Sequence, residues 1–264
     1  MIADLTGKTA LVTGGTMGIG LATALALARH GAQCTLTYKW GTADVSEVLA
    51  RFEQARALAP RIIQADVSVN EDTDRLLDQM REQTDRVDIL ISNVSVALLI
   101  DKLQDYSLRS LMKTIQYSAW PMYEYTERIH SRFESYPRYV IGMSSSGPDS
   151  FSKGYDFMGM SKAVLETMCR YMSHRLYQQD VHINIVRSQA VRTQSLRETF
   201  AGFEDFAKQF MDEKHFVDAD EVANVIVSLC SGYLDGMRGQ VINVDRGISQ
   251  FDNLIHFFNH ESGS

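Results

Sequence analysis

The chain has 264 residues, of which 45% are hydrophobic and only 4 are prolines, so it is long enough and apolar enough to fold around a large core. Its 33 acidic residues outnumber the 26 lysines and arginines, which gives a formal net charge of -7. This balance excludes a general attraction to nucleic acid or to an anionic membrane, so an anionic ligand has to be met by a local cluster of donors.

The cysteines and the start of the chain are typical of a protein of the reducing cytoplasm. Cys34, Cys169 and Cys230 lie far apart and form no Cys-x-x-Cys or Cys/His pattern, which predicts neither a zinc site nor a disulfide framework. We therefore expect reduced core thiols, no metal centre and a cytoplasmic location. The first residues, MIADLTGKTALVTGG, reach glycine after one short apolar run and resemble neither a signal peptide nor a membrane span.

Short apolar runs alternate with segments of helical length along most of the chain. The runs are rich in β-branched residues and are predicted to be seven strands, at residues 8–13, 32–38, 61–65, 87–92, 138–144, 182–187 and 240–244. The segments between them show helical periodicity, and Gly31 provides a stop after the first. This alternation predicts a Rossmann-type α/β fold, with a doubly wound parallel seven-stranded sheet covered on both faces. We expect a single domain over residues 1–258 and a tail at 259–264.

A glycine-rich stretch, TGGTMGIG at residues 13–20, lies between the first predicted strand and the first predicted helix. Gly14, Gly18 and Gly20 are spaced Gly-x-x-x-Gly-x-Gly. Glycine lets the backbone turn sharply and approach a pyrophosphate, whose charge is then met by the free amides of a helix N-terminus. A glycine-rich turn without a ligand is the alternative, but the order of strand, loop and helix favours a dinucleotide site.

This loop, in a chain of this length, resembles the short-chain dehydrogenase/reductase family, and the resemblance runs from about Leu5 to about Gly247. Further landmarks follow in the family's order: ADV at 65–67, SNV at 92–94 where the family usually has Asn-Asn-Ala-Gly, a serine run, a lysine on the next helix, and INVDRG. The loop VRSQAVRT lacks the usual Pro-Gly pair but keeps a matching threonine. The resemblance assigns cofactor binding to Gly14, Thr16, Gly18, Ile19, Gly20, Lys39, Asp66, Val67, Asn93, Lys162, Val191 and Thr193.

The end of the second predicted strand, LTYKW, bears on the choice of cofactor. No carboxylate stands where one would bind the adenosine ribose 2′-hydroxyl and repel a 2′-phosphate, whereas Lys39 can pair with that phosphate. We therefore expect NADPH in preference to NADH. Met17 stands where many NADPH-using members carry a basic residue, and Lys39 as a solvated loop charge is the alternative.

The stretch GYDFMGMSKAVLE, residues 154–166, places Tyr155 seven positions before Lys162, whereas common members of the family have a spacing of four. Met158 occupies the ordinary tyrosine position and has no proton to give, so ordinary ketone reduction is expected to be severely weakened. Seven positions also return a side chain to nearly the same helical face, about two turns away. A phenol displaced in this way suits conjugate reduction of an enoyl thioester, in which negative charge develops on the thioester oxygen.

The same segment resembles the enoyl-acyl-carrier-protein reductases, a divergent branch of the family that carries Tyr-x6-Lys. This branch also has a Met-Gly pair where Met158 and Gly159 stand. The resemblance implies that Tyr155 is the catalytic tyrosine, and that Lys162 holds the nicotinamide ribose and lowers the pKa of the phenol. The combination of an ordinary glycine loop with the displaced tyrosine resembles an NADPH-using subgroup of that branch.

At two further positions this chain differs from one or the other of the two branches. Ser145 stands where many enoyl reductases have a second tyrosine and matches the serine of ordinary ketone reducers, so it is the third catalytic candidate, with a strand cap as the alternative. The asparagine that ordinary members place on the helix before the fifth strand is not evident near Gln116 and Tyr117. A proton relay through that asparagine is therefore not expected.

Residues 194–216 are expected to form a substrate lid, as the segment after the sixth strand does in this family. Their phenylalanines predict one amphipathic helix with an aromatic face that suits an acyl chain, at positions 200, 203, 206 and 210. The lid region also carries basic side chains that can form a docking patch for an acidic acyl-carrier protein, although acidic residues are interleaved with them: Arg192, Arg197, Lys208 and Lys214.

Assembly is expected from the resemblance as well. Relatives form a dimer through the helices on either side of the fifth strand and a tetramer through a C-terminal contact. The segment LETMCRYMSHRL is apolar on more than one face, and the ending FDNLIHFF fits the second contact. We expect a homotetramer or a homodimer.

Three hypotheses for function follow. The leading one is an NADPH-dependent reductase of 2-enoyl thioesters, serving fatty acid or polyketide biosynthesis. The second is a reductase of 3-oxoacyl thioesters or other ketones, in which Ser145 and Tyr155 are rearranged around a carbonyl. The third is a cofactor-binding scaffold or sensor without turnover.

Overall fold

The computed structural model describes residues 3–39, 44–199, 201–209, 215–250 and 252. Its centre is a parallel sheet in the order β3-β2-β1-β4-β5-β6-β7, which confirms the predicted strands and the doubly wound Rossmann-type domain. The strands are β1 (Thr9–Val12), β2 (Gln33–Tyr38), β3 (Arg61–Gln64), β4 (Ile89–Ser92), β5 (Tyr139–Ser144), β6 (His182–Ser188) and β7 (Val241–Val244).

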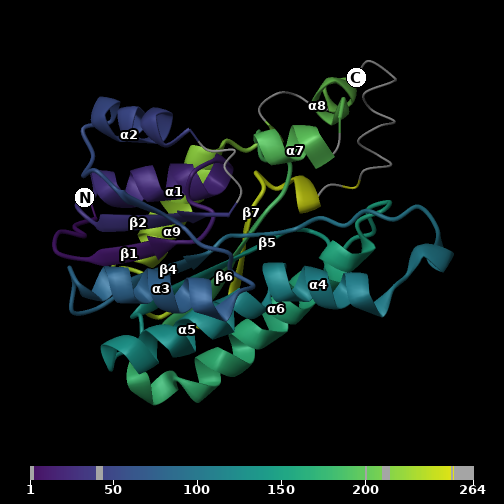
Figure 1. Ribbon diagram of the computed structural model, residues 1–264. Coiled ribbons are helices and arrows are strands. Elements are labelled where there is room, and N and C mark those ends of the chain that lie inside the picture. The colour runs from purple at the N-terminus through teal and green to yellow at the C-terminus, as the bar shows by residue number, and fades with distance from the viewer. Residues whose placement is uncertain (1–2, 40–43, 200, 210–214, 251, 253–264) are drawn as a thin grey trace.

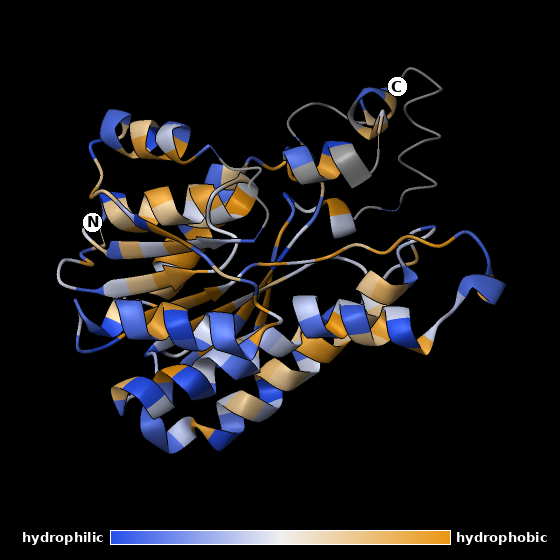
Figure 2. Cartoon of the chain, in the orientation of Figure 1, coloured by the Kyte–Doolittle hydropathy of each residue, from blue (hydrophilic) through white to orange (hydrophobic). Residues whose placement is uncertain are grey.

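Helices cover both faces of this sheet (Figure 1). The helices are α1 (Gly18–Arg29), α2 (Val45–Gln54), α3 (Asn70–Arg81), α4 (Leu108–Ser118), α5 (Trp120–Phe133), α6 (Asp156–Arg175), α7 (Gln194–Thr199), α8 (Phe203–Ala207) and α9 (Ala219–Leu229). The core has two halves: α1, α2 and α9 pack on one face of the sheet, and α3, α5 and α6 pack on the other. Figure 2 shows the hydrophobic residues concentrated on the strands and on the inward sides of these helices.

The order of the strands reverses between β1 and β4, which places a crevice at their carboxyl ends. Both strands are fully buried and pair in parallel with each other. The loops that follow them, residues 13–17 and 93–96, therefore emerge side by side. Helix α1 begins directly after the first loop and runs back along the sheet to Arg29, and Gly31, with a φ of +97°, lies just beyond its C-cap residue and stops it. The fold therefore directs the glycine-rich loop and the loop containing Asn93 toward the same point.

The lid differs from its prediction. The described residues 194–199 and 203–207 form two short helices, α7 and α8, and not one continuous helix, because Gly202 at φ +79° turns the backbone before α8. Phe206 is exposed and Phe203 is half-buried, whereas Phe200 and Phe210 lie outside the described residues. The aromatic face as a whole therefore stays a prediction, as do the tail at 259–264 and the C-terminal contact.

Candidate active site

The glycine-rich loop is closed by a contact between Gly14 and Gly20 that leaves no room for a side chain at Gly20. A Cβ atom on Gly20 would lie 2.3 Å from the main-chain oxygen of Gly14 and 2.6 Å from the amide nitrogen of Asn93. Gly14 and Gly18 have φ angles of +61° and +55°, which glycine adopts without strain. The spacing of these glycines is therefore required by the backbone itself.

Asn93 connects this loop to the end of β4. Its side-chain nitrogen donates to the main-chain oxygens of Thr13 and Gly14, both at 3.1 Å, and its main-chain amide donates to Thr13 Oγ1 at 3.0 Å. Helix α1 begins just beyond, and its N-cap residue, Met17, makes no side-chain hydrogen bond to the first turn. The amides at the helix N-terminus thus face the loop and are suited to bind a pyrophosphate. We refer to residues 13–20 and Asn93 as the nucleotide end of the site.

Other predicted cofactor residues surround this end. Thr193 lies against Gly18, since a Cβ atom there would be 3.7 Å from the Thr193 methyl group, and its hydroxyl accepts from the amide of Leu196 at 3.2 Å. Val191 forms an isolated parallel bridge with Val217, which anchors the start of the lid. The remaining members are buried or half-buried beside the loop ends: Thr16, Ile19 and Val67.

Lys39 and Asp66 form an ion pair at the carboxyl ends of β2 and β3. The Lys39 amine also donates to the hydroxyl of Tyr117, which in turn donates to Asp66 Oδ2 at 3.2 Å. Burial acts to lower the pKa of Lys39, but the hydrogen bonds to Asp66 and Tyr117 outweigh it and the pKa is raised. Burial likewise acts to raise the pKa of Asp66, and hydrogen bonds from Lys39 and Ser68 lower it overall. Both groups are therefore charged at neutral pH, and Lys39 is directed at Asp66.

We refer to the three catalytic candidates, Ser145, Tyr155 and Lys162, as the reaction end of the site, and the structure brings Ser145 and Tyr155 into contact. Tyr155 is the N-cap residue of α6, and its hydroxyl donates to Ser145 Oγ at 3.4 Å. Burial raises the pKa of Tyr155, and the hydrogen bond to Ser145 opposes that shift only in part. The phenol is thus protonated at neutral pH, and the net shift is upward, opposite to the lowering expected from Lys162. Met158 is buried at the ordinary tyrosine position, where its sulfur accepts from Ser118 Oγ at 3.8 Å.

Lys162 is 4% exposed and its amine is held by two acceptors. Its Nζ donates to the main-chain oxygen of Met143 at 2.8 Å and to Ser95 Oγ at 2.5 Å. Burial lowers the pKa of Lys162 to about 8, although the charge of Glu166 acts to raise it. The contact with Ser95 was not predicted from the sequence. The signal was nevertheless present, because Ser95 follows SNV at the place where the family's Asn-Asn-Ala-Gly pattern has glycine.

An ion-pair network with a buried Arg187–Glu166 pair at its centre supports the reaction end and was also not predicted. Arg187, at the end of β6, donates through Nε and Nη2 to the two carboxylate oxygens of Glu166, at 3.0 and 2.6 Å. It also donates through Nη1 to Asp149, in the loop between β5 and α6. Ser144 adds a hydrogen bond to Glu166 at 2.6 Å. One arginine therefore ties together β6, α6 and the loop that separates Ser145 from Tyr155.

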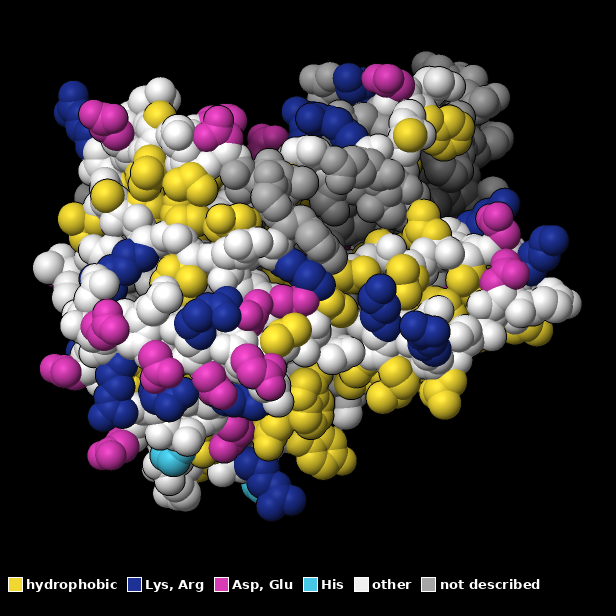
Figure 3. Space-filling model, viewed as in Figure 1, with side chains coloured by type: hydrophobic (Ala, Val, Ile, Leu, Met, Phe, Trp, Pro, Cys, Tyr) yellow, Lys and Arg dark blue, Asp and Glu magenta, His cyan; other side chains and the backbone are white. Residues whose placement is uncertain are grey.

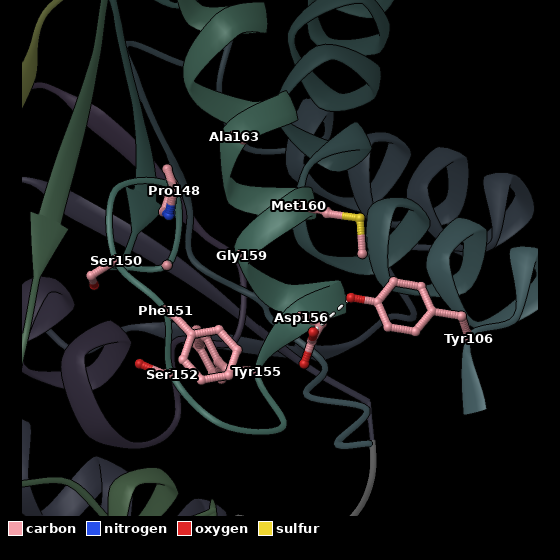
Figure 4. Close-up of a pocket in the computed structure, with 11 residues that line it drawn as sticks. Tyr106, Pro148, Ser150, Phe151, Ser152, Tyr155, Asp156, Gly159, Met160 and Ala163 are labelled. Atoms are coloured by element: carbon pink, nitrogen blue, oxygen red, sulfur yellow. Dashed lines mark hydrogen bonds between the residues drawn. The ribbon is translucent and has the colours of Figure 1, made fainter. Parts of the chain in front are cut away.

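An open pocket of about 300 Å³ is lined in part by Tyr155 (Figure 4). Residues 147–148 and 150–152 form one wall and the first turns of α6 form the other. Tyr106 crosses the pocket rim and donates to Asp156 Oδ1 at 2.6 Å, while Phe151 is 85% exposed. The loop beside the catalytic candidate is therefore backed by space and not by packed core.

The lid and the rest of the molecule add little chemistry to this site. Arg192 lies over the ring of Phe216 at 5.2 Å, Lys208 pairs with Asp205 at 3.9 Å, and Lys214 is outside the described residues. Within the described part of the chain, no His, Cys, Asp and Glu cluster is arranged to hold a metal ion. No described helix combines the length and apolar composition needed to cross a bilayer.

Comparisons with known proteins agree with this geometry. The family model described as enoyl-(acyl carrier protein) reductase matches residues 14–249. The chain is 24% identical to the NADH-dependent enoyl-[acyl-carrier-protein] reductase FabI of Aquifex aeolicus, over 92% of each sequence. It is 25% identical to the 1-cyclohexenylcarbonyl-CoA reductase of Streptomyces collinus, over 92% of this chain and 87% of the relative.

Solved structures share the fold at lower identity. The Pseudomonas aeruginosa RhlG/NADP active-site complex superposes with a TM-score of 0.81 at 23% identity, over 92% of this chain and 97% of the other. At this identity the likeness concerns the fold alone. It supports the single-domain fold with a parallel seven-stranded sheet described above.

Proposed function

This chain belongs to the enoyl-(acyl carrier protein) reductase family of short-chain dehydrogenases/reductases, and on that premise we propose that it reduces the carbon-carbon double bond of a 2-enoyl thioester with NADPH. It is an oxidoreductase that uses a nicotinamide dinucleotide. The observation that carries the finer proposal is the position of Tyr155. Its protonated hydroxyl lies beside Ser145 at the start of α6, and a methionine fills the place from which ordinary members protonate a ketone.

The residues of the nucleotide end fit the dinucleotide. The close approach of Gly14 and Gly20 leaves a cradle that any Cβ atom would fill, and the amides of α1 face it. When bound, the cofactor would supply a hydride to the β-carbon of the substrate. The glycine loop, Asn93, Lys162 and Thr193 would hold it.

Tyr155 acts on the other end of the conjugated system. As negative charge develops on the thioester oxygen, its hydroxyl donates a hydrogen bond and then its proton to that oxygen. Burial keeps the phenol protonated until it is needed, because it raises the pKa of Tyr155. Ser145 accepts from the phenol in the free protein and is positioned to donate to the same thioester oxygen when substrate is bound.

The cofactor preference follows from Lys39. Its amine pairs with Asp66, whose counterpart contacts adenine in this family. A 2′-phosphate offers the amine an alternative anionic partner and leaves Asp66 free for adenine, whereas NADH offers no such group. We therefore propose NADPH as the preferred cofactor.

A ketone reductase is the second candidate, because the contact between Tyr155 and Ser145 pairs the two side chains that ordinary members place around a carbonyl. In that case the substrate is a 3-oxoacyl thioester whose carbonyl lies closer to Ser145. A cofactor-binding protein without turnover is the outcome if neither class of substrate reacts.

Partners are proposed from surface features. Hydrophobic side chains gather over α4 and α6 (Figure 3), and those with large exposed fractions include Leu108, Met112, Val164 and Tyr171. We propose that a second copy of the chain covers this face, with a homotetramer as the full assembly. An acyl-carrier protein is proposed to approach the lid, where Arg192, Arg197 and Lys208 lie.

The test is NADPH oxidation followed at 340 nm with crotonyl and longer 2-enoyl thioesters, compared with the matching 3-oxoacyl thioesters. Turnover of the enoyl series supports the proposal, and turnover of the 3-oxo series alone supports the ketone reductase. No turnover of either series refutes both reductase hypotheses. Tyr155→Phe is expected to reduce enoyl turnover by about two to four orders of magnitude while NADPH still binds. Tyr233→Phe, an exposed tyrosine beyond α9, is the matched control and leaves turnover unchanged.

A further inference from the structure

Ser95 and Lys162 differ sharply in their access to solvent, although their side chains are in direct contact. Lys162 is buried among the residues of α6 and β5, whereas Ser95 is exposed in the loop after β4. The amine nevertheless donates to the serine hydroxyl at 2.5 Å, the shorter of its two hydrogen bonds. The hydroxyl therefore stands between a buried ammonium group and water.

Helix α4, where ordinary family members carry the relay asparagine, offers no equivalent contact in the described structure. Gln116 donates to the main-chain oxygen of Ser68, Tyr117 pairs with Lys39 and Asp66, and Ser118 binds Val96 N and the sulfur of Met158. These side chains are all engaged elsewhere. Ser95 is the side chain that reaches Lys162 from the sheet's carboxyl edge.

We propose that Ser95 is a positioning residue for Lys162 and the route by which this lysine exchanges protons with solvent. This inference rests on the proposed function for its catalytic meaning, but the contact itself does not depend on the substrate. As an acceptor, the hydroxyl stabilises the charged amine and fixes its direction. As a donor, it can reprotonate the amine after a proton has left.

The proton transfer balances without any further reactant. When Lys162 is neutral, its nitrogen takes the proton of the Ser95 hydroxyl, and the serine oxygen takes a proton from water. One N–H bond forms at Lys162, the O–H bond of Ser95 is broken and remade, and the hydroxide left behind is neutralised in bulk solvent. No oxidant, reductant or metal is required.

Other charged and titratable groups near Lys162 also affect its pKa. Glu166, one turn later on α6, acts to raise the lysine pKa, and it is itself paired with Arg187 of β6, which also binds Asp149. Tyr155, at the start of α6, has a pKa raised by burial and is neutral at the relevant pH. These groups are unchanged by substitution of Ser95, so a shift in the lysine titration reports the loss of the hydroxyl.

The experiment measures NADPH affinity by fluorescence from pH 6 to pH 10 for the wild type, Ser95→Ala, Ser95→Gly and Ser95→Thr. Affinity is expected to fall as Lys162 loses its proton, near its pKa of about 8 in the wild type. Removal of the hydroxyl lowers that pKa, so in the alanine and glycine variants the fall moves to lower pH by about one unit. Threonine keeps the hydroxyl and restores the wild-type midpoint. Ser228→Ala removes an exposed hydroxyl on α9 and is the matched control.

Each result is decisive for one of the two proposals. A midpoint that does not move in Ser95→Ala and Ser95→Gly overturns the role of Ser95, as does a shift that threonine fails to reverse. A reversible shift in a protein that binds NADPH but leaves enoyl thioesters unreduced supports Ser95 and overturns the proposed function. If enoyl reduction occurs, its pH profile is expected to move with the binding midpoint.

Discussion

The nucleotide end and the reaction end of the site are held together in different ways. At the nucleotide end, main-chain atoms determine the shape: Gly14 and Gly20 touch each other, and Asn93 binds main-chain oxygens. At the reaction end, side chains from separate segments determine it, through Ser95 with Lys162 and through the pairing of Arg187 with Glu166. A site of the first kind tolerates few changes at its glycines, whereas a site of the second kind can be retuned one side chain at a time.

The largest expected effect is at the nucleotide end, with Gly20→Ala. The new Cβ atom would lie 2.3 Å from a main-chain oxygen, which no side-chain movement can relieve. We expect NADPH binding to weaken by about 100-fold or more, together with a loss of about 1–3 kcal/mol in the free energy of unfolding.

Gly236→Ala is the matched control, since a Cβ atom there meets nothing within 4 Å. Isothermal titration with NADPH and urea denaturation measure the two effects. Similar results for both variants would mean that the close approach at Gly20 does not shape the cofactor site.

The second effect tests the reaction end, with Arg187→Met. This change leaves the carboxylate of Glu166 buried without its cation, and removal of one partner of a buried pair typically costs about 3–5 kcal/mol. Urea denaturation measures the loss. The loop that separates Ser145 from Tyr155 also loses its tie to β6, so kcat is expected to fall more than NADPH affinity.

Arg246→Met provides the comparison, because Arg246 binds both oxygens of Glu221 with similar geometry but in an exposed position. Exposed pairs contribute about 0–1 kcal/mol, so its loss should be small. Equal losses for the two variants would show that burial does not strengthen the dependence on Arg187.

This contrast also explains what could be predicted from the sequence. The strands, their parallel order and the glycine loop follow from local patterns, because alternating apolar runs and glycine spacing are consequences of the backbone. The placement of Lys162 on α6 with Tyr155 at its N-cap follows from a similar local pattern, since the two residues are close together in the chain. These features need only short stretches of the chain.

The missed contacts join residues that are far apart in the chain. Ser95 and Lys162 are separated by 67 positions, and Arg187 lies 38 positions from Asp149. No periodicity of the sequence predicts such pairs, because they depend on how β4, β5 and β6 pair side by side in the sheet. The lid was mispredicted for a local reason: the phenylalanine spacing indicated one helix, but Gly202 adopts a left-handed conformation that interrupts it.

The third effect concerns stability at the reaction end, with Lys162→Met. The lysine pKa falls from 10.5 in the unfolded chain to about 8 in the folded one, so below pH 8 burial of the charge destabilises the free protein. Wild-type stability is therefore expected to rise by on the order of 2–3 kcal/mol between pH 8 and pH 10.5, because the unfolded state binds more protons in that range.

The methionine variant lacks this rise and is expected to be at least as stable as the wild type at pH 7, although it is inactive. Thermal unfolding across this pH range makes the comparison. A variant that is markedly less stable at pH 7, or that keeps the alkaline rise, would show that the buried amine does not impose this cost.

The smallest effect concerns Lys39, the side chain on which the proposed preference of the nucleotide end for NADPH depends. In Lys39→Gln the 2′-phosphate of NADPH loses its cation, and we expect the affinity for NADPH to fall about tenfold, the effect of a single partly exposed charge pair. The affinity for NADH should change little, because that cofactor leaves Lys39 paired with Asp66. Fluorescence titration with both cofactors measures the ratio.

Lys8→Gln separates this effect from the general loss of one positive charge. Lys8 also pairs with a buried aspartate, Asp88 at 3.3 Å, but at the amino ends of the strands. It should leave both affinities unchanged. If Lys39→Gln instead weakens NADH and NADPH equally, Lys39 acts by orienting Asp66 toward adenine and not by binding the phosphate. The nucleotide end would then be held by backbone and ion pair together, and its preference for NADPH would have to come from another residue.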